Sequence, residues 1–163
     1  MRQSDLGASG AVMHERPMPN SEPAWPLEDY PSLTSAEIRY ADLDRQGHVN
    51  NAVFATFSEI GRVAFLYDPE RPLAPEGASF VIARLAIDFH AELLWPGTVA
   101  IGTGVTKIGR SSFTLAQGLF NEGRCVARVE AVIVLFDTAT RVSRPLPPTA
   151  TAILERLTLR ARS

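Results

Sequence analysis

Residues 42–51, DLDRQGHVNN, place two aspartates, a glycine, a histidine and two asparagines directly before a long apolar segment. Asp and Asn side chains cap helices and shape turns, and glycine adopts backbone conformations that other residues avoid. A carboxylate beside the first turn of a helix can also act on a group held by the free backbone N–H groups there. The stretch therefore supports two interpretations: a turn that begins a helix, and a catalytic site built on that turn.

The segments around this stretch predict one helix and a sheet. Residues 50–66, NNAVFATFSEIGRVAFL, are apolar on nearly every side apart from Ser58, Glu59 and Arg62, which predicts a helix that is covered all round. We expect strands at about 34–40, 79–93, 98–108, 112–120 and 125–137, the last four forming an antiparallel meander, and a short amphipathic helix within 144–160. The pattern indicates an α+β domain, in which an antiparallel sheet of about five strands wraps round a long central helix.

The chain divides into a tail and one domain. Residues 1–31 hold five prolines among small and polar residues and show no helical or strand period, so we predict a flexible tail, part of which (Trp25, Leu27 and Tyr30) could lie against the domain. Residues 32–163 are predicted to form a single domain, because 163 residues allow one good hydrophobic core but not two.

Composition excludes several classes of function. The formal charge of −2 and the lack of a basic block argue against nucleic acid. No apolar run is long enough to cross a membrane and no apolar signal core is visible, so the expected setting is the cytoplasm. Cys125 is the only cysteine, which excludes an intrachain disulfide, and three scattered histidines predict no metal site. No glycine-rich phosphate loop is present, so no cofactor is expected.

The segment from Arg39 to Arg62 resembles the hotdog-fold acyl-CoA thioesterases of the 4-hydroxybenzoyl-CoA thioesterase family. Their motif runs Asp-x-Asp-x-x-Gly-His-Val-Asn-Asn and continues to two aromatic residues and Glu-x-Ala-Arg. The matching residues here are Asp42, Asp44, Gly47, His48, Val49, Asn50, Asn51, Phe54, Phe57, Glu59 and Arg62. The resemblance continues through DFHAELLWPG, IGRSSFTLAQGLF and RPLP, so it covers about residues 33–150. The chain departs from the family at Phe54 and Phe57, where tyrosine is common, and at Gly61, where alanine is usual.

The resemblance implies hydrolysis of an acyl-CoA thioester to the free acid and CoA, without a cofactor. Asp44 would act as nucleophile or general base, and the backbone N–H of Asn51, aided by the helix dipole, would polarise the thioester carbonyl. Gly47 would permit the sharp turn before the helix. The family also implies a homodimer or homotetramer, with each site near a subunit interface.

Other residues of the motif have competing interpretations. We expect Asp42 to bond turn amides, His48 to brace the loop, and Asn50 to cap the helix. Glu59 lies in an otherwise apolar helix, where Arg62 could neutralise it. Because some hotdog thioesterases use a glutamate on this helix as the base, Glu59 is kept as a second candidate.

The segment IGRSS, residues 108–112, is predicted to be a hairpin turn. The family places the matching segment near CoA, which would let Arg110 pair with phosphate and Ser111 or Ser112 bond polar groups near the thioester. Two other functions are weighed on the same fold. A non-catalytic acyl-CoA or fatty-acyl binding domain would not need the Asp44 carboxylate, and a dehydratase or hydratase would need an Asp/His or His/Glu pair that we do not find.

Overall fold

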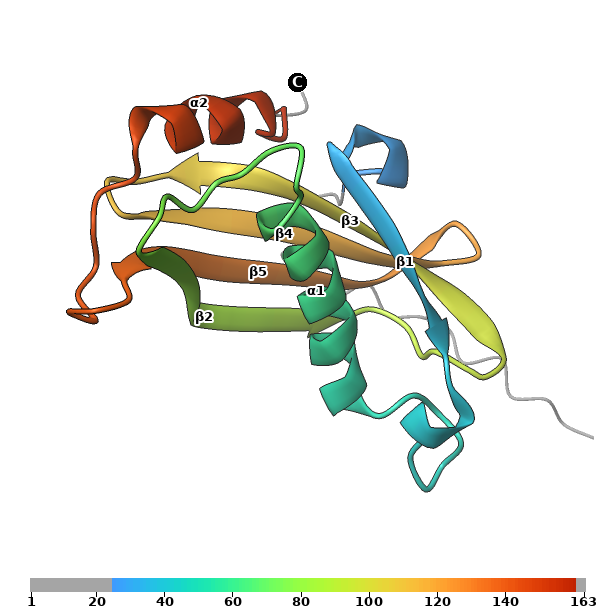
Figure 1. Ribbon diagram of the computed structural model, residues 1–163. Helices are drawn as coiled ribbons and strands as arrows, with labels where there is room; N and C mark the ends of the chain where they lie inside the picture. The colour runs from blue at the N-terminus through green and yellow to red at the C-terminus, as the bar shows by residue number, and fades with distance from the viewer. Residues whose placement is uncertain (1–24, 161–163) are drawn as a thin grey trace, which may run out of the picture.

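A computed structural model describes residues 25–160 of the chain. Its elements are η1 (Leu27–Asp29), β1 (Ser32–Ile38), η2 (Tyr40–Asp42), α1 (Asn51–Leu66), β2 (Ala78–Phe89), β3 (Gly97–Ile108), β4 (Ser112–Asn121), β5 (Arg124–Asp137) and α2 (Pro148–Arg156) (Figure 1). Every predicted helix and strand is present within a few residues of its expected bounds. Residues 1–24 of the predicted tail lie outside the described residues.

The five strands form one antiparallel sheet in the order β1-β3-β4-β5-β2. The predicted hotdog architecture is confirmed, since the sheet curves around α1. The meander prediction is wrong for β2, which pairs with β5 at the far edge and not with β3. The reason is the connection at residues 90–96, which is too long for a tight hairpin and leads across to the start of β3. Its Leu93 is 1% exposed and anchors the connection in the core, whereas Leu94 and Trp95 are 57% and 48% exposed.

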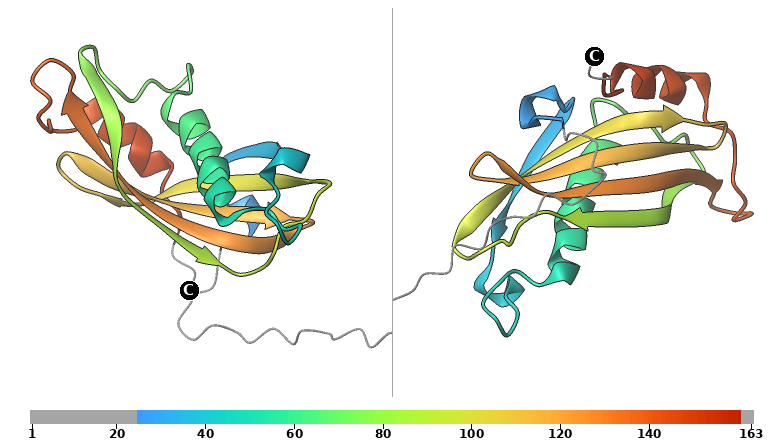
Figure 2. Two further views of the ribbon diagram at one scale, coloured as in Figure 1. Left: turned by 90° about the horizontal axis from the view of Figure 1, so that it is seen from below. Right: turned by 180° about the vertical axis from the view of Figure 1, so that it is seen from behind.

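The long helix is held on the concave face of the sheet by two groups of apolar side chains. Phe54 and Phe57, near the start of α1, pack in a cluster with residues of β1, β3, β4 and β5. Phe65 and Leu66, near its end, pack in a second cluster with β3, β4, β5 and α2. The helix contacts β1, β3 and β4 in particular (Figure 2, left). Burial of these large side chains stabilises the position of α1, at about 1.5–3 kcal/mol for each one.

The expectation that α1 is covered on all sides is wrong for the single chain. Ile60 and Val63 are 37% and 49% exposed. On β2, Val81, Ile82 and Leu85 are 42%, 46% and 37% exposed. The sheet covers only one side of α1, so the helix and the edge strand β2 leave an apolar face open between them.

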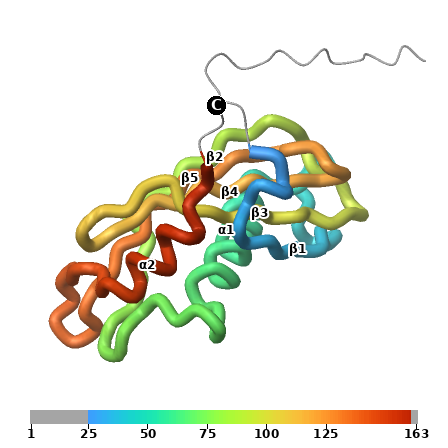
Figure 3. Tube along the Cα trace, turned by 90° about the horizontal axis from the view of Figure 1, so that it is seen from above, coloured from blue at the N-terminus to red at the C-terminus, as the bar shows by residue number. Residues whose placement is uncertain are grey.

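Residues 25–30, which the sequence places in the tail, pack on the opposite face of the sheet. The ring of Tyr30 lies over Gly102 and Gly118, which face each other on β3 and β4. A Cβ on Gly102 would lie 2.4 Å from this ring, so only glycine leaves room for it. Trp25 donates its indole N–H to the Arg160 carbonyl at 2.9 Å, which brings the two ends of the described chain together (Figure 3). The packed part of the chain therefore includes Trp25 to Tyr30.

None of the helices within residues 25–160 is long and apolar enough to cross a membrane.

Candidate active site

The Asp44 carboxylate is built into a tight loop. Its Oδ1 accepts the backbone N–H groups of Gln46 and His48, at 2.7 and 3.2 Å. The Asp44 backbone N–H donates to the His48 carbonyl at 2.7 Å, and Gly47 donates to the Asp44 carbonyl at 3.1 Å. Gly47 has φ +85°, which a residue with a Cβ rarely adopts. Oδ1 of Asp44 therefore has the turn-shaping role expected from the sequence. No hydrogen bond to Oδ2 is found among the described residues.

Asp42 has a different environment. It is 3% exposed, and its carboxylate accepts hydrogen bonds from the backbone N–H of Arg39 at 2.8 Å and from the Arg39 guanidinium at 2.7 Å. The hydrogen bond from the Arg39 side chain holds the pKa of Asp42 below its ordinary value. The Asp42 carbonyl also accepts the Asn50 N–H at 2.9 Å. Asp42 thus fastens η2 to the start of α1, as expected for a turn residue.

The first turn of α1 has one backbone donor that remains available. Asn50 is the N-cap, and its side chain accepts the Ala52 N–H at 2.9 Å. The Val53 N–H donates to the Asn50 carbonyl at 2.8 Å. No acceptor for the Asn51 N–H is found within residues 25–160, and Asn51 is exposed. This N–H points from the positive end of the helix dipole, where a developing negative charge is stabilised.

His48 joins this loop to the connection between β2 and β3. It forms an isolated β-bridge with Leu94, and the next residue, Val49, donates its N–H to the Leu93 carbonyl at 2.9 Å. The His48 Nε2 lies 3.4 Å from a carboxylate oxygen of Glu92. This geometry fits a brace that holds the loop in place.

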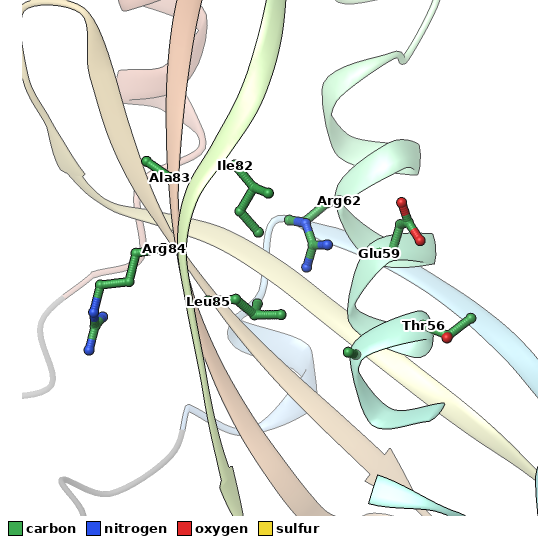
Figure 4. Close-up of a pocket in the computed structure, with 8 residues that line it drawn as sticks. Thr56, Glu59, Arg62, Ile82, Ala83, Arg84 and Leu85 are labelled. Carbon is green, nitrogen blue, oxygen red and sulfur yellow. The ribbon is translucent and has the colours of Figure 1, made fainter. Parts of the chain in front are cut away.

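A pocket of about 330 Å³ lies between α1 and β2. Its lining residues come from the middle of the helix and the middle of the strand: Ala55, Thr56, Glu59, Arg62, Ile82, Ala83, Arg84 and Leu85 (Figure 4). In Figure 4 the Arg62 guanidinium points toward β2, and the Glu59 carboxylate points away from the strand. The two side chains are not within ion-pair distance, so the expected neutralisation of Glu59 by Arg62 is limited to a longer-range attraction, which partly opposes the lowering of the Arg62 pKa by burial.

Arg62 is held by a buried polar network that the sequence analysis did not identify. Its Nη1 donates to the Ser58 hydroxyl, which donates to Oε1 of Gln117 at 2.8 Å. The Gln117 amide donates to the Ser58 carbonyl and to the Thr103 hydroxyl, both at 3.0 Å. Burial lowers the pKa of Arg62. The signal was visible as three polar residues in an apolar helix, but their partners on β3 and β4 could not be read from spacing.

Arg110, Ser111 and Ser112 lie at the opposite end of the sheet from Asp44. They form the predicted hairpin between β3 and β4, where Gly109 donates to the Ser112 carbonyl at 2.7 Å. The Asp44 loop follows Ile38, which pairs with Gly97 at the start of β3. Ile108 is eleven residues further along β3, about 36 Å at a rise of about 3.3 Å per residue. A single chain does not bring this hairpin and Asp44 together.

Within residues 25–160, no three His, Cys, Asp or Glu side chains are grouped so as to hold a metal ion. The arrangement at the start of α1 offers instead one fixed carboxylate and one free N–H donor on the same loop and helix turn. These are the parts required to attack a carbonyl and to stabilise its oxygen.

Known proteins resemble the chain over most of its length. The acyl-CoA thioester hydrolase YbgC of Escherichia coli O6:H1 is 24% identical over 132 residues, which cover 78% of this chain and 92% of that protein. The PA5185 protein of Pseudomonas aeruginosa PAO1 superposes with a TM-score of 0.75 at 24% identity, covering 84% of this chain and 98% of its own. A thioesterase of Thermus thermophilus, solved with coenzyme A and Zn, gives a TM-score of 0.70 at 28% identity, covering 83% and 99%.

The family model described as the thioesterase-like superfamily matches residues 38–157, which include α1, the Asp44 loop and β2 to β5. The resemblance found in the sequence is thereby confirmed: the chain belongs to the thioesterase-like superfamily.

Proposed function

We propose that the protein hydrolyses an acyl-CoA thioester to the free acid and CoA. The observation that carries this proposal is the pairing of a fixed Asp44 carboxylate with the free Asn51 N–H at the start of α1. The name of the Escherichia coli relative, an acyl-CoA thioester hydrolase, supports the same activity. The coenzyme A bound by the Thermus thermophilus thioesterase supports CoA as the leaving group.

The chemistry follows from the two groups. The thioester oxygen accepts the Asn51 N–H, and the positive end of the helix stabilises the negative charge that forms on this oxygen. Asp44 either takes a proton from water, whose oxygen then bonds to the carbonyl carbon, or attacks that carbon itself to form an anhydride that water hydrolyses. The C–S bond breaks and the sulfur leaves as a thiolate, which gains a proton from solvent. Because a thiolate is a good leaving group, no strong general acid is needed.

The role of Asp44 in the loop favours this chemistry over a purely structural one. Two amide hydrogen bonds fix Oδ1, which orients the carboxylate and leaves Oδ2 for water or substrate. Glu59 is the second candidate for the base, but it lies two turns further along α1 and its carboxylate points away from β2 (Figure 4). We assign Gly47 and His48 to holding the loop around the thioester, and Glu59 to the acyl pocket.

A second copy of the chain would complete the site. Within residues 25–160, the edge strand β2 has β5 as its one neighbour. Antiparallel pairing of two β2 strands across a two-fold axis would cover this open edge. It would also bring the β3–β4 hairpin of one copy toward the Asp44 loop of the other. In that arrangement, Arg110 could meet a CoA phosphate, and Ser111 or Ser112 the polar groups near the thioester.

Hydrolysis of a panel of acyl-CoA esters, followed by detection of the released thiol, tests the function. The panel should cover short, long and aromatic acyl groups, because the pocket alone does not fix the acyl chain. Hydrolysis of at least one ester, above the rate without protein, is expected. The competing function is a non-catalytic acyl-CoA binding domain, in which Asp44 would serve only to shape the turn. Tight binding of an acyl-CoA without turnover would establish it.

A further inference from the structure

Arg62 is a buried cation that forms no ion pair with a carboxylate of residues 25–160. The residue is 8% exposed, and its hydrogen bond is to the neutral Ser58 hydroxyl. Within residues 25–160, no carboxylate oxygen lies within 4.0 Å of its guanidinium. Buried charges in proteins are almost always paired, because an unpaired one loses its hydration without compensation. The remaining N–H donors of Arg62 face the pocket between α1 and β2.

The other charged residues of the pocket do not satisfy Arg62. Glu59 is one turn away on α1, and its carboxylate is exposed and directed away from the strand (Figure 4). Arg84, the second cation of the pocket lining, already pairs with Glu130 on β5. Glu59 still attracts Arg62 at longer range within the chain, since it opposes the lowering of the Arg62 pKa by burial. The pocket lining therefore holds one guanidinium and one carboxylate that no ion pair joins within residues 25–160.

The surroundings of this pair indicate what covers it. Five consecutive residues of β2, 81–85, are exposed. Ile60 and Val63 on α1 continue the same apolar face. This apolar face ends at the open edge of β2, and an open strand edge can pair with the same edge of a second copy. An exposed apolar face beside such an edge is typical of a protein–protein contact. In a two-fold interface, each contact occurs twice: if one residue of the first copy contacts a second residue of the other copy, the same contact forms with the copies exchanged.

We propose that a second copy of the chain closes this pocket and that Glu59 of each copy pairs with Arg62 of the other. The two opposite charges on one helix face make the face self-complementary, so the dimer gains two ion pairs related by the two-fold axis. The Ser58–Gln117–Thr103 network holds each guanidinium in position before the copies meet. The pocket between α1 and β2 is thus incomplete in one chain. This inference rests on the dimer of the proposed function, but not on the hydrolytic activity.

Charge reversal in separate chains gives the sharpest test. In a Glu59→Arg homodimer, the introduced guanidinium would face Arg62 of the other copy, and in an Arg62→Glu homodimer, two glutamates would face each other. A mixed dimer would restore both ion pairs, because one chain then carries two arginines and the other two glutamates. Coexpression of the two variants with different tags, followed by native mass spectrometry, should give mixed dimers well above the share expected from random pairing. A random distribution would overturn the proposal, since a pair within one chain is not repaired by mixing.

Glu59→Gln is the second variant, because Glu59 is exposed and its loss should leave the fold intact even if Arg62→Glu does not fold. Its dimer dissociation constant should rise by about tenfold or more, the effect expected for leaving a buried charge unpaired at an interface. The matched control is Glu155→Gln on α2, away from β2, which should leave dimerisation unchanged. Unchanged dimerisation of Glu59→Gln would overturn the proposal, whatever its effect on the preference among acyl groups.

The test separates this inference from the proposed function. Dimerisation is measured without substrate, so a result that refutes the ion pair would not refute acyl-CoA hydrolysis. Conversely, mixed dimers that form as expected, together with a parent protein that hydrolyses no thioester, would support the interface and refute the enzyme.

Discussion

Gly61 of α1 lies directly against the Gln117 side chain of β4. A Cβ on Gly61 would lie 2.6 Å from the Gln117 amide nitrogen and 2.5 Å from a methyl carbon of Ile101. Gln117 is 1% exposed and is fixed by its hydrogen bonds to Ser58 and Thr103. The departure from the family at Gly61 thus has a physical reason, because the glycine leaves the space that the glutamine amide fills.

Gly61→Ala should therefore destabilise the protein, although alanine is the better helix former. The helix propensity would add about 1 kcal/mol, but the displaced Gln117 and Ile101 should cost more, for a net loss of about 1–2 kcal/mol. Urea denaturation followed by circular dichroism measures this change. In a Gln117→Ala background the same substitution should cost less, since the amide is gone. A Gly61→Ala variant that is more stable than the parent would contradict the tight contact.

Asp42 should stabilise the loop in a pH-dependent way. Its pKa is lowered in the folded state, chiefly by the Arg39 side chain. A carboxyl group with a lowered pKa stabilises the fold above its unfolded pKa of about 3.9, and this stability is lost as the pH falls through the lower, folded value. Asp42→Asn should cost about 1 kcal/mol at pH 7, a modest figure because the Arg39 side chain is 71% exposed. The difference between the parent and Asp42→Asn in free energy of unfolding should shrink below about pH 4. A difference that persists undiminished to about pH 2, below the usual range of a carboxyl group, would place the effect elsewhere.

The architecture was predictable from local patterns, and the errors arose where distant segments meet. Apolar periodicity, the cap at Asn50 and the turns of the three consecutive strands β3, β4 and β5 are encoded within short windows. The placement of β2 beside β5 depends on a connection whose path is set by packing of Leu93 against the core. The open side of α1 was missed because an all-round apolar pattern does not say which chain covers it.

The candidate site follows the same division. The Asp44 loop and the first turn of α1 lie within ten residues, so their proximity could be read from the sequence. The Ser58–Gln117 contact joins residues 59 positions apart, and no spacing rule predicts such a pair. The position of Arg110 at the far end of β3 could not be inferred without the strand register, although the hairpin itself could.

Arg110→Ala should weaken the binding of CoA esters without changing the chemical step. If Arg110 meets a CoA phosphate, KM should rise and become less dependent on salt, and kcat should stay nearly constant. A short thioester that lacks the nucleotide should be hydrolysed as before. Lys107→Ala, also near this hairpin, is the comparison for a general loss of positive charge. Equal losses on both thioesters would assign Arg110 to structure or chemistry instead.

The Asp44→Asn substitution tests the proposed catalyst most directly. The Asn side-chain oxygen can still accept the N–H groups of Gln46 and His48, so the loop should keep its shape. It cannot attack a carbonyl or take a proton from water, so kcat should fall by about 10² or more. Acyl-CoA binding, dimerisation and the free energy of unfolding should stay close to those of the parent. Steady-state kinetics measures the change in kcat, and isothermal titration calorimetry measures the binding of acyl-CoA.

Two companion variants decide between the carboxylates. Asp42→Asn should lose more stability and less activity than Asp44→Asn, because Asp42 is occupied by Arg39. Glu59→Gln should retain turnover in proportion to the dimer that it still forms. If Glu59→Gln abolishes turnover in the dimer while Asp44→Asn remains active, the base lies on α1. If all three variants keep full activity, no carboxylate among them attacks the thioester or activates water, and the free Asn51 N–H would then serve only to bind it.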